Sequence, residues 1–201
     1  MSLAYESVLV LGPYLKLRSV LARHRKRAVV IEVGVDRWVV VPEPVWHRME
    51  ITDNLARLFG EATESWTAAF QVSSEPDQYT VVIQHSGRRF HLYHSEQGHT
   101  FTNRNEDDEP IVIDVRGRRY RPGDPRPTGP YGADPEMFLP LAAGPVDRAG
   151  LAAVLTGTAE PATRHLGVLH HLGIDPGPLR MTFEEAVQSR LGRVTPGPRP
   201  S

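Results

Sequence analysis

The change in hydrophobic period near Ser65 constrains the fold of this chain more than any other feature of its sequence. From Ser65 to Tyr120, apolar residues recur at every second position. The first run places four residues on one face: Trp66, Ala68, Phe70 and Val72. Side chains of a strand point alternately to its two faces, so this pattern predicts a half-buried strand. Three further β-rich runs follow at hairpin spacing, which predicts an antiparallel meander.

Two similar phrases, VVIQHSGRRF at 81–90 and IVIDVRGRRY at 111–120, are predicted to be tight hairpins. In the first, a turn at Ser86 and Gly87 supplies the positive φ that a two-residue hairpin loop requires. The expected cross-strand pairs are Gln84 with Arg89, Ile83 with Phe90, Val82 with His91, and Val81 with Leu92. In this register the large apolar side chains face the core, and the Gln, Arg and His side chains face water.

The second phrase has the same form around Arg116 and Gly117, which pairs Asp114 with Arg119 and Ile113 with Tyr120. An opposite-charge pair across two strands contributes about 0.2–1 kcal/mol. Two interpretations of the arginines stay open. They are either solvated residues at exposed strand starts, or together they form a surface for an anion or an acidic partner. The residues concerned are Arg88, Arg89, Arg118 and Arg119.

Four elements are expected before the meander. A strand over residues 7–11 leads into a helix that begins near Pro13, because proline suits a first helical position. The run AVVIEVGVDRWVVVP is predicted to be a hairpin around Gly34, Val35 and Asp36. The run ITDNLARLFG is predicted to be a short helix that is capped by Thr52 or Asp53 and ended by Gly60.

The C-terminal part is predicted to be helical. A linker rich in proline and glycine precedes it over residues 121–135. Three helices then follow, each with an end signal in the sequence. The signals are an N-cap at Asp147 with a stop at Gly157, a Schellman stop at Gly173 and Ile174, and a capping box of Thr182 and Glu185.

Together these elements predict an α+β fold, in which a mostly antiparallel β-meander sheet is packed by helices and followed by a short helical C-terminal segment. We expect the sheet domain over residues 1–135, the helical segment packed on it over 136–194, and a disordered tail over 195–201. A chain of 201 residues, 40% of them hydrophobic, is long enough for one sizeable core.

Charge and composition narrow the classes of partner and compartment. The formal net charge is −1, so no global field draws the chain to nucleic acid or to an anionic membrane. No run reaches the roughly 18 apolar residues of a membrane span, and the N-terminus lacks the features of a signal peptide, which predicts a cytoplasmic protein. There is no cysteine, so disulfides and thiolate sites are excluded. Lys16 and Lys26 are the only lysines beside many arginines, which indicates a GC-rich bacterial coding bias.

The histidine-rich segments do not match a metal site. His91 and His94 are three residues apart in a predicted strand, so they are expected on opposite faces. His165, His170 and His171 lack the i, i+4 spacing of a helical zinc pair and are expected at a solvent-facing helix end. We therefore expect no metal and no cofactor.

The two charged runs also have ordinary structural interpretations. The basic run ARHRKR at 22–27 closes a predicted helix, where cations complement the carbonyl end, and no aromatic residues interleave with it as stacking platforms. Nucleic-acid binding is therefore not expected. The acidic run NEDDEP at 105–110 lacks the glycine and the alternating oxygen ligands of an EF-hand loop, so it is predicted to be a solvated connection.

The sequence carries no Gly-x-Ser-x-Gly elbow, P-loop, His-Glu-x-x-His motif or dinucleotide fingerprint. We therefore expect a non-catalytic bacterial binding or regulatory protein, such as an immunity-type inhibitor or a chaperone-like adaptor. It would grip a protein partner through the polar face of the sheet, since Arg and Tyr are favoured interface anchors. The expected partner-binding residues are Arg89, His91, Tyr93 and Arg119.

The alternative is a small hydrolase or transferase that uses a histidine as general base. A deep pocket in which a histidine meets a carboxylate and a Ser or Tyr hydroxyl would favour the enzyme, and a shallow sheet face would favour the binding protein.

Overall fold

A computed structural model of the chain describes residues 4–44, 50–104, 110–114, 117–121 and 124–195. The elements, in chain order, are β1 (Ala4–Leu11), α1 (Tyr14–Arg23), β2 (Ala28–Gly34), β3 (Arg37–Pro42), α2 (Glu50–Thr63), β4 (Trp66–Ser74), β5 (Asp77–His85), β6 (Arg88–His94), β7 (Thr100–Arg104), β8 (Pro110–Asp114), β9 (Arg119–Tyr120), the 3-10 helix η1 (Pro135–Leu141), α3 (Arg148–Thr156), α4 (Pro161–His171), α5 (Pro176–Leu179), α6 (Phe183–Ser189) and β10 (Gly192–Val194).

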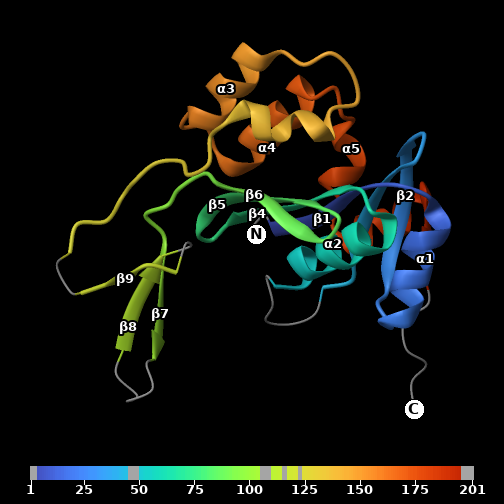
Figure 1. Cartoon of the computed structure of the whole chain (residues 1–201), viewed down its shortest axis with the longest axis horizontal. Helices are drawn as coiled ribbons and strands as arrows, with labels where there is room; N and C mark the ends of the chain where they lie inside the picture. Colours follow the sequence, from blue (N-terminus) through green and yellow to red (C-terminus); the bar gives the residue numbers. More distant parts are fainter. Residues whose placement is uncertain (1–3, 45–49, 105–109, 115–116, 122–123, 196–201) are drawn as a thin grey trace.

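The fold is α+β and is built on a seven-stranded sheet in the order β10-β2-β3-β1-β4-β5-β6. Every pairing recorded in this sheet is antiparallel, and β4, β5 and β6 form the predicted meander. Strands β7, β8 and β9 do not continue it. They form a separate three-stranded sheet that extends away from the larger one (Figure 1).

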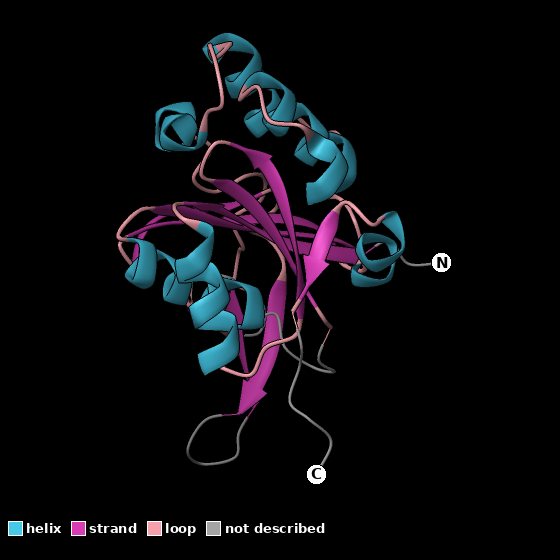
Figure 2. Cartoon of the chain, turned by 90° about the vertical axis from the view of Figure 1, so that its right-hand side faces the viewer, coloured by secondary structure: helices cyan, strands magenta, loops and turns pink. Residues whose placement is uncertain are grey.

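Helices cover both faces of the large sheet, which therefore lies between two helical layers (Figure 2). Alternation along β1 shows how the sequence builds them: Leu9 belongs to the core under the C-terminal helices, whereas Val8 and Val10 belong to the core under α1 and α2. The first core also contains Leu151, Val168 and other buried residues of the C-terminal helices. Helices within the predicted segment 136–194 form this layer, but Gly192–Val194, which are predicted to belong to the helical segment, form strand β10 of the sheet.

The C-terminal helices have the end signals that the sequence predicts. The side chain of Asp147 accepts a hydrogen bond from the Gly150 amide, and Gly157 is the C-cap of α3. After α4, Gly173 has φ +67° and the Ile174 amide donates to the Leu169 carbonyl at 2.9 Å, which is a Schellman stop. The capping box of Thr182 and Glu185 at the start of α6 is also confirmed.

Helix α2 differs from its predicted bounds at both ends. It begins at Glu50, so Thr52 and Asp53 lie inside the helix, and it runs through Gly60 to Thr63. Their side chains make tertiary contacts instead: Thr52 donates to the Glu6 carboxylate, and Asp53 accepts from Gln84 on β5. A Cβ on Gly60 would lie 2.8 Å from the Gly87 amide nitrogen, so this glycine allows close packing on the β5–β6 turn and does not end the helix.

A β-bulge in β6 corrects the predicted register of the first hairpin. Gln84 pairs with Arg89 as predicted, but Ile83 pairs with His91 and Val82 with Leu92. Phe90 is therefore the extra residue, and every residue after it lies on the opposite face from the one predicted. The predicted pairs of Ile83 with Phe90 and of Val82 with His91 are wrong, because pattern alone cannot show where an extra residue interrupts the ladder.

The register of the second hairpin is also one residue from the prediction. Ile113 pairs with Arg119 and Val112 with Tyr120, so the predicted pair of Asp114 with Arg119 is wrong. The Asp114 carboxylate instead accepts from the Arg118 amide at 2.9 Å and from the Tyr120 hydroxyl at 2.8 Å. These bonds hold the turn together by local contacts to the acid.

The end of the chain contributes a strand that the sequence does not signal. After α6, β10 pairs with β2 at one edge of the sheet. The disordered tail is predicted over 195–201. Residues 196–201 lie outside the described residues, but the prediction is wrong for Thr195, which is buried and whose hydroxyl accepts from the Ala28 amide at 3.1 Å. Within the described residues, no helix is both long enough and apolar enough to cross a membrane.

Candidate partner-binding surface

The four residues predicted to bind a partner do not form one surface. Arg89 is exposed on β6, with 59% of its side chain accessible, and donates to the Asp53 carboxylate at 3.0 Å. His91 is half-buried, and its Nε2 donates to the Gly132 carbonyl at 2.7 Å. Tyr93 has no exposed surface. Arg119 is exposed on β9, in the other sheet (Figure 1).

The bulge explains why Tyr93 is inside. Its ring packs edge-on against that of Tyr79 at 5.6 Å, and its hydroxyl donates to the Leu155 carbonyl of α3 at 3.0 Å. Tyr93 therefore joins the sheet to the C-terminal helical layer. Burial lowers the pKa of His91, which faces the same layer near Phe138. Neither ring lies on an open polar sheet face.

The same bulge creates a different surface at the end of the β5–β6 hairpin. Phe90 is turned outward and is 47% exposed, and its ring meets that of Trp66 edge-on at 4.9 Å. Trp66 in turn lies 4.4 Å from the ring of His85. We refer to four residues as the hairpin surface: Trp66, His85, Arg88 and Phe90. Arg89 points to the opposite face of the sheet, where it contacts Asp53 of α2.

The two arginines at the start of β6 point to opposite faces of the sheet and have different neighbours. Arg89 is oriented by Asp53 of α2, whose carboxylate also accepts from Gln84. Among the described residues, Arg88 has no hydrogen-bond or ion-pair partner, so its exposed guanidinium keeps all its donors for solvent or for another molecule. The hairpin surface therefore combines a half-exposed phenyl ring with one cation, Arg88, that has no partner among the described residues.

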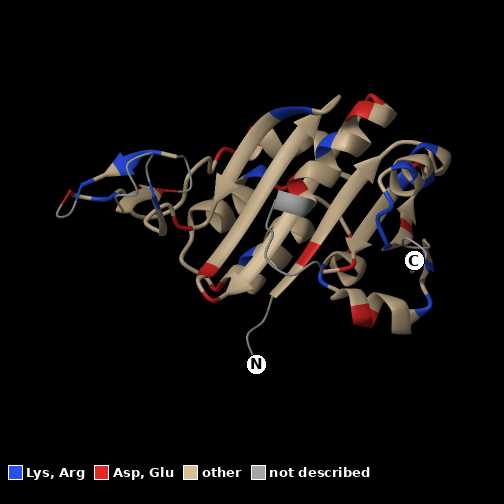
Figure 3. Ribbon diagram, turned by 90° about the horizontal axis from the view of Figure 1, so that it is seen from below, with Lys and Arg blue, Asp and Glu red and all other residues tan. Residues whose placement is uncertain are grey.

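Charge elsewhere is dispersed. Figure 3 shows Lys and Arg interspersed with Asp and Glu across the side of the molecule seen from below, in keeping with the net charge of −1. Electrostatic recognition would thus be local, as the composition predicts.

His165 corrects another prediction, since it is fully buried and does not face solvent. Its Nδ1 lies 2.9 Å from the Tyr5 hydroxyl, and its ring stacks on Phe70 at 5.3 Å and packs against Tyr79 at 5.1 Å. Burial lowers its pKa to about 3, so the ring is neutral in the folded protein at neutral pH. It lies between the sheet and α4, out of reach of a substrate in solution.

The other histidines bear on the enzyme alternative. His94 lies on the opposite face of β6 from His91, and its Nδ1 is 2.9 Å from both the Gln78 amide nitrogen and the Thr80 hydroxyl. Because the Gln78 amide can only donate, His94 Nδ1 is an acceptor, and burial lowers the pKa of this ring to about 4. His171 Nδ1 lies 3.2 Å from a carboxylate oxygen of Asp147. No hydroxyl is recorded in contact with that pair within the described residues.

No group of three or more His, Asp or Glu side chains is placed to hold a metal ion in the described ranges. No protein-family model matches the chain. Comparisons with curated proteins and with solved structures find no match either. The surface must therefore be interpreted from its own chemistry.

Sequence reasoning missed both Phe90 as a surface residue and His165 as a core residue. A signal existed for the histidine: His165, Val168, Leu169 and Leu172 follow the i, i+3, i+4, i+7 pattern of a buried helical face. No comparable signal marks Phe90, because a bulge is chosen by what the whole hairpin packs against.

Proposed function

We propose that this is a non-catalytic binding protein that recognises a protein partner through the hairpin surface. The observation that carries the proposal is the outward position of Phe90, held edge-on to Trp66, with the exposed Arg88 two residues before it on β6. Aromatic and arginine side chains supply most of the binding energy in protein interfaces, and a preoriented ring loses little entropy on binding. An immunity-type inhibitor or a chaperone-like adaptor in a bacterial cytoplasm is the kind of protein that we propose.

Side chains, and not the free edge of β6, would make the contact. The C-terminal half of this edge strand is already paired, because the amides and carbonyls of His94 and Tyr131 exchange hydrogen bonds at 3.0 and 2.8 Å. Gly132 approaches it as well, since a Cβ there would lie 2.1 Å from the Leu92 carbonyl oxygen. A partner strand therefore has no continuous edge to extend, which favours recognition by the ring and the guanidinium group.

The experiment compares variants of exposed residues only. A partner captured from the native host is identified, produced separately and titrated calorimetrically against wild type and the double variant Arg88→Glu, Phe90→Ser. We expect the double variant to bind at least ten-fold more weakly with unchanged thermal stability. A Val35→Ser variant, which changes a 93% exposed apolar residue at the β2–β3 turn, is the matched control and should bind as wild type does. Equal affinity of the double variant would remove the hairpin surface from the proposal.

A further inference from the structure

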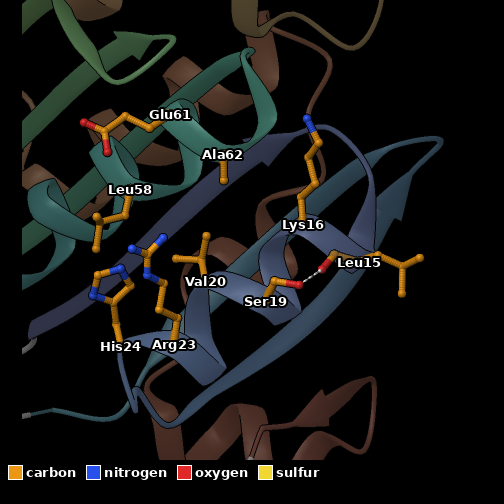
Figure 4. A pocket seen from close by; sticks show the side chains of 9 residues that line it. All are labelled: Leu15, Lys16, Ser19, Val20, Arg23, His24, Leu58, Glu61 and Ala62. Atoms are coloured by element: carbon orange, nitrogen blue, oxygen red, sulfur yellow. Dashed lines mark hydrogen bonds between the residues drawn. The ribbon is translucent and has the colours of Figure 1, made fainter.

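Helices α1 and α2 lie side by side on one face of the sheet and enclose a groove of about 480 Å³ (Figure 4). Val20 of α1 and Leu58 and Ala62 of α2 supply its apolar lining. Val20 is buried, whereas Leu58 and Ala62 are half-buried, so part of the apolar surface stays accessible to water. The groove is formed by α1 and α2, whereas the hairpin surface lies on β4, β5 and β6.

One wall of the groove is basic. Lys16 and Arg23 line it from α1 and His24 from the C-cap of that helix, and all three are exposed. Arg23 has no ion-pair partner among the described residues, and Lys16 reaches Glu64 only at 4.0 Å. The acidic lining residue, Glu61, is already paired with Arg57 of its own helix. The unbalanced charge that faces the groove is therefore positive.

The shape and the charge together point to one kind of occupant. A groove between two exposed helices accepts a third helix, whose apolar side chains at i, i+3 or i+4, and i+7 enter it. The shorter of the two helices, α1, has 10 residues and extends for about 15 Å, so about three turns of a bound helix can lie along both. Acidic side chains flanking the apolar stripe would meet Lys16 and Arg23.

We propose that the groove between α1 and α2 binds an acidic amphipathic helix of a protein partner. The groove proposal rests on the proposed function only because its ligand is also a segment of a protein. The residues that line the groove are different from those of the hairpin surface. Part of the basic run at 22–27 also ends α1, because the Lys26 amide donates to the Leu21 carbonyl at 2.9 Å. In this proposal, Arg23 of the same run has a second role, which is to bind the partner helix.

The test is a selection from a displayed library of 16-residue peptides against the full chain, with the double variant Lys16→Glu, Arg23→Glu for counter-selection. Both substitutions are at exposed positions, and unchanged thermal denaturation verifies the fold. Arg18→Glu makes one such charge reversal on an exposed residue of α1 that does not line the groove. We expect the enriched peptides to be acidic and amphipathic, to bind wild type and Arg18→Glu equally, and to bind the double variant at least ten-fold more weakly.

Hydrogen exchange with a bound peptide should protect α1 and α2. Failure to enrich peptides that prefer wild type, enrichment of neutral or basic peptides, or protection of the hairpin surface instead would each overturn the proposal. So would tighter binding of a 20-nucleotide single-stranded RNA than of any selected peptide, since the basic wall would then serve nucleic acid.

The two proposals fail separately. If the native partner loses affinity for the Arg88→Glu, Phe90→Ser variant but not for Lys16→Glu, Arg23→Glu, the groove proposal fails and the hairpin surface stands. The reverse result would refute the hairpin surface and support the groove.

Discussion

Arg164 is a buried cation that stabilises the junction between the end of β6 and the connection from α3 to α4. It is 5% exposed and donates to the Tyr93 hydroxyl and the Ser95 carbonyl, both at 3.1 Å, and to the Gly157 carbonyl at 2.5 Å. Arg164→Met would leave these buried acceptors unsatisfied, so we expect the free energy of unfolding to fall by about 3 kcal/mol. The free energy of unfolding is measured by urea denaturation with tryptophan fluorescence as the signal.

The control for Arg164 is Arg148→Met, which removes an exposed arginine that pairs with Glu136 at 3.0 Å. A surface pair contributes about 0–1 kcal/mol, so this variant should be close to wild type. If the two variants lose the same stability, Arg164 is not the junction residue that its contacts indicate.

His165 should make the protein sensitive to acid. Its folded pKa is about 3, and an unfolded histidine titrates near 6.5, so the unfolded chain takes up the proton first as the pH falls. Its contribution to stability is complete above pH 6.5 and falls by on the order of 1.4 kcal/mol per pH unit between pH 6.5 and pH 3. In His165→Phe the free energy of unfolding should depend less steeply on pH over pH 4–7.

His170→Phe makes the same change at an exposed position of α4, and His94 is present in every variant. The free energy of unfolding of His170→Phe should therefore depend on pH as steeply as that of wild type. Parallel pH profiles for wild type and His165→Phe would show that another group causes the acid sensitivity.

At the scale of an element, the bulge makes β6 tolerant of a deletion at one position only. Removing Phe90 leaves Arg89 opposite Gln84 and His91 opposite Ile83 as consecutive pairs, so the hairpin becomes regular and Tyr93 stays in the core. Removing Leu92 would move Tyr93 to the other face. We expect the Phe90 deletion to fold with a loss of about 1 kcal/mol or less, and the Leu92 deletion to lose cooperative unfolding.

Near-ultraviolet circular dichroism and thermal denaturation distinguish these two deletions. Equal damage by both would mean that Phe90 is an integral part of the ladder. The Phe90 deletion should also lose binding of the partner while keeping the fold, because it removes the exposed ring.

For the whole molecule, the sheet and the C-terminal layer should unfold together. One core joins sheet residues such as Phe70 and Ile83 to Leu155 and Leu169 of the helices. In addition, β10, which follows the helices in the chain, pairs with β2 at the edge of the sheet. We expect the slowest amides of β5 and α4 to exchange with the same opening free energy in native-state hydrogen exchange. Residues 1–135 alone should lack a cooperative transition, because the sheet face under that layer would be exposed to water. Opening of α3 to α6 at a lower free energy than the sheet would show that 136–194 is a separate unit.

Local signals in the sequence predicted much of this fold. The cap at Asp147, the stop at Gly173 and the capping box at Thr182 all rest on bonds between residues within six positions, so neighbouring residues suffice to specify them. The face of β4 that carries Trp66, Ala68, Phe70 and Val72 follows from alternation in the same way.

The candidate site depended on contacts between distant segments. Phe90 is exposed because β6 places Tyr93 under α3, and Asp53 binds Arg89 because α2 runs on past Gly60 against the β5–β6 turn. A bulge, an edge strand such as β10 and a buried pair such as Tyr5 with His165 each gain their free energy from distant partners. Val194 of β10, for example, pairs with Val29, 165 positions away. Propensity and periodicity report only on neighbours, so these features arise when the layers pack.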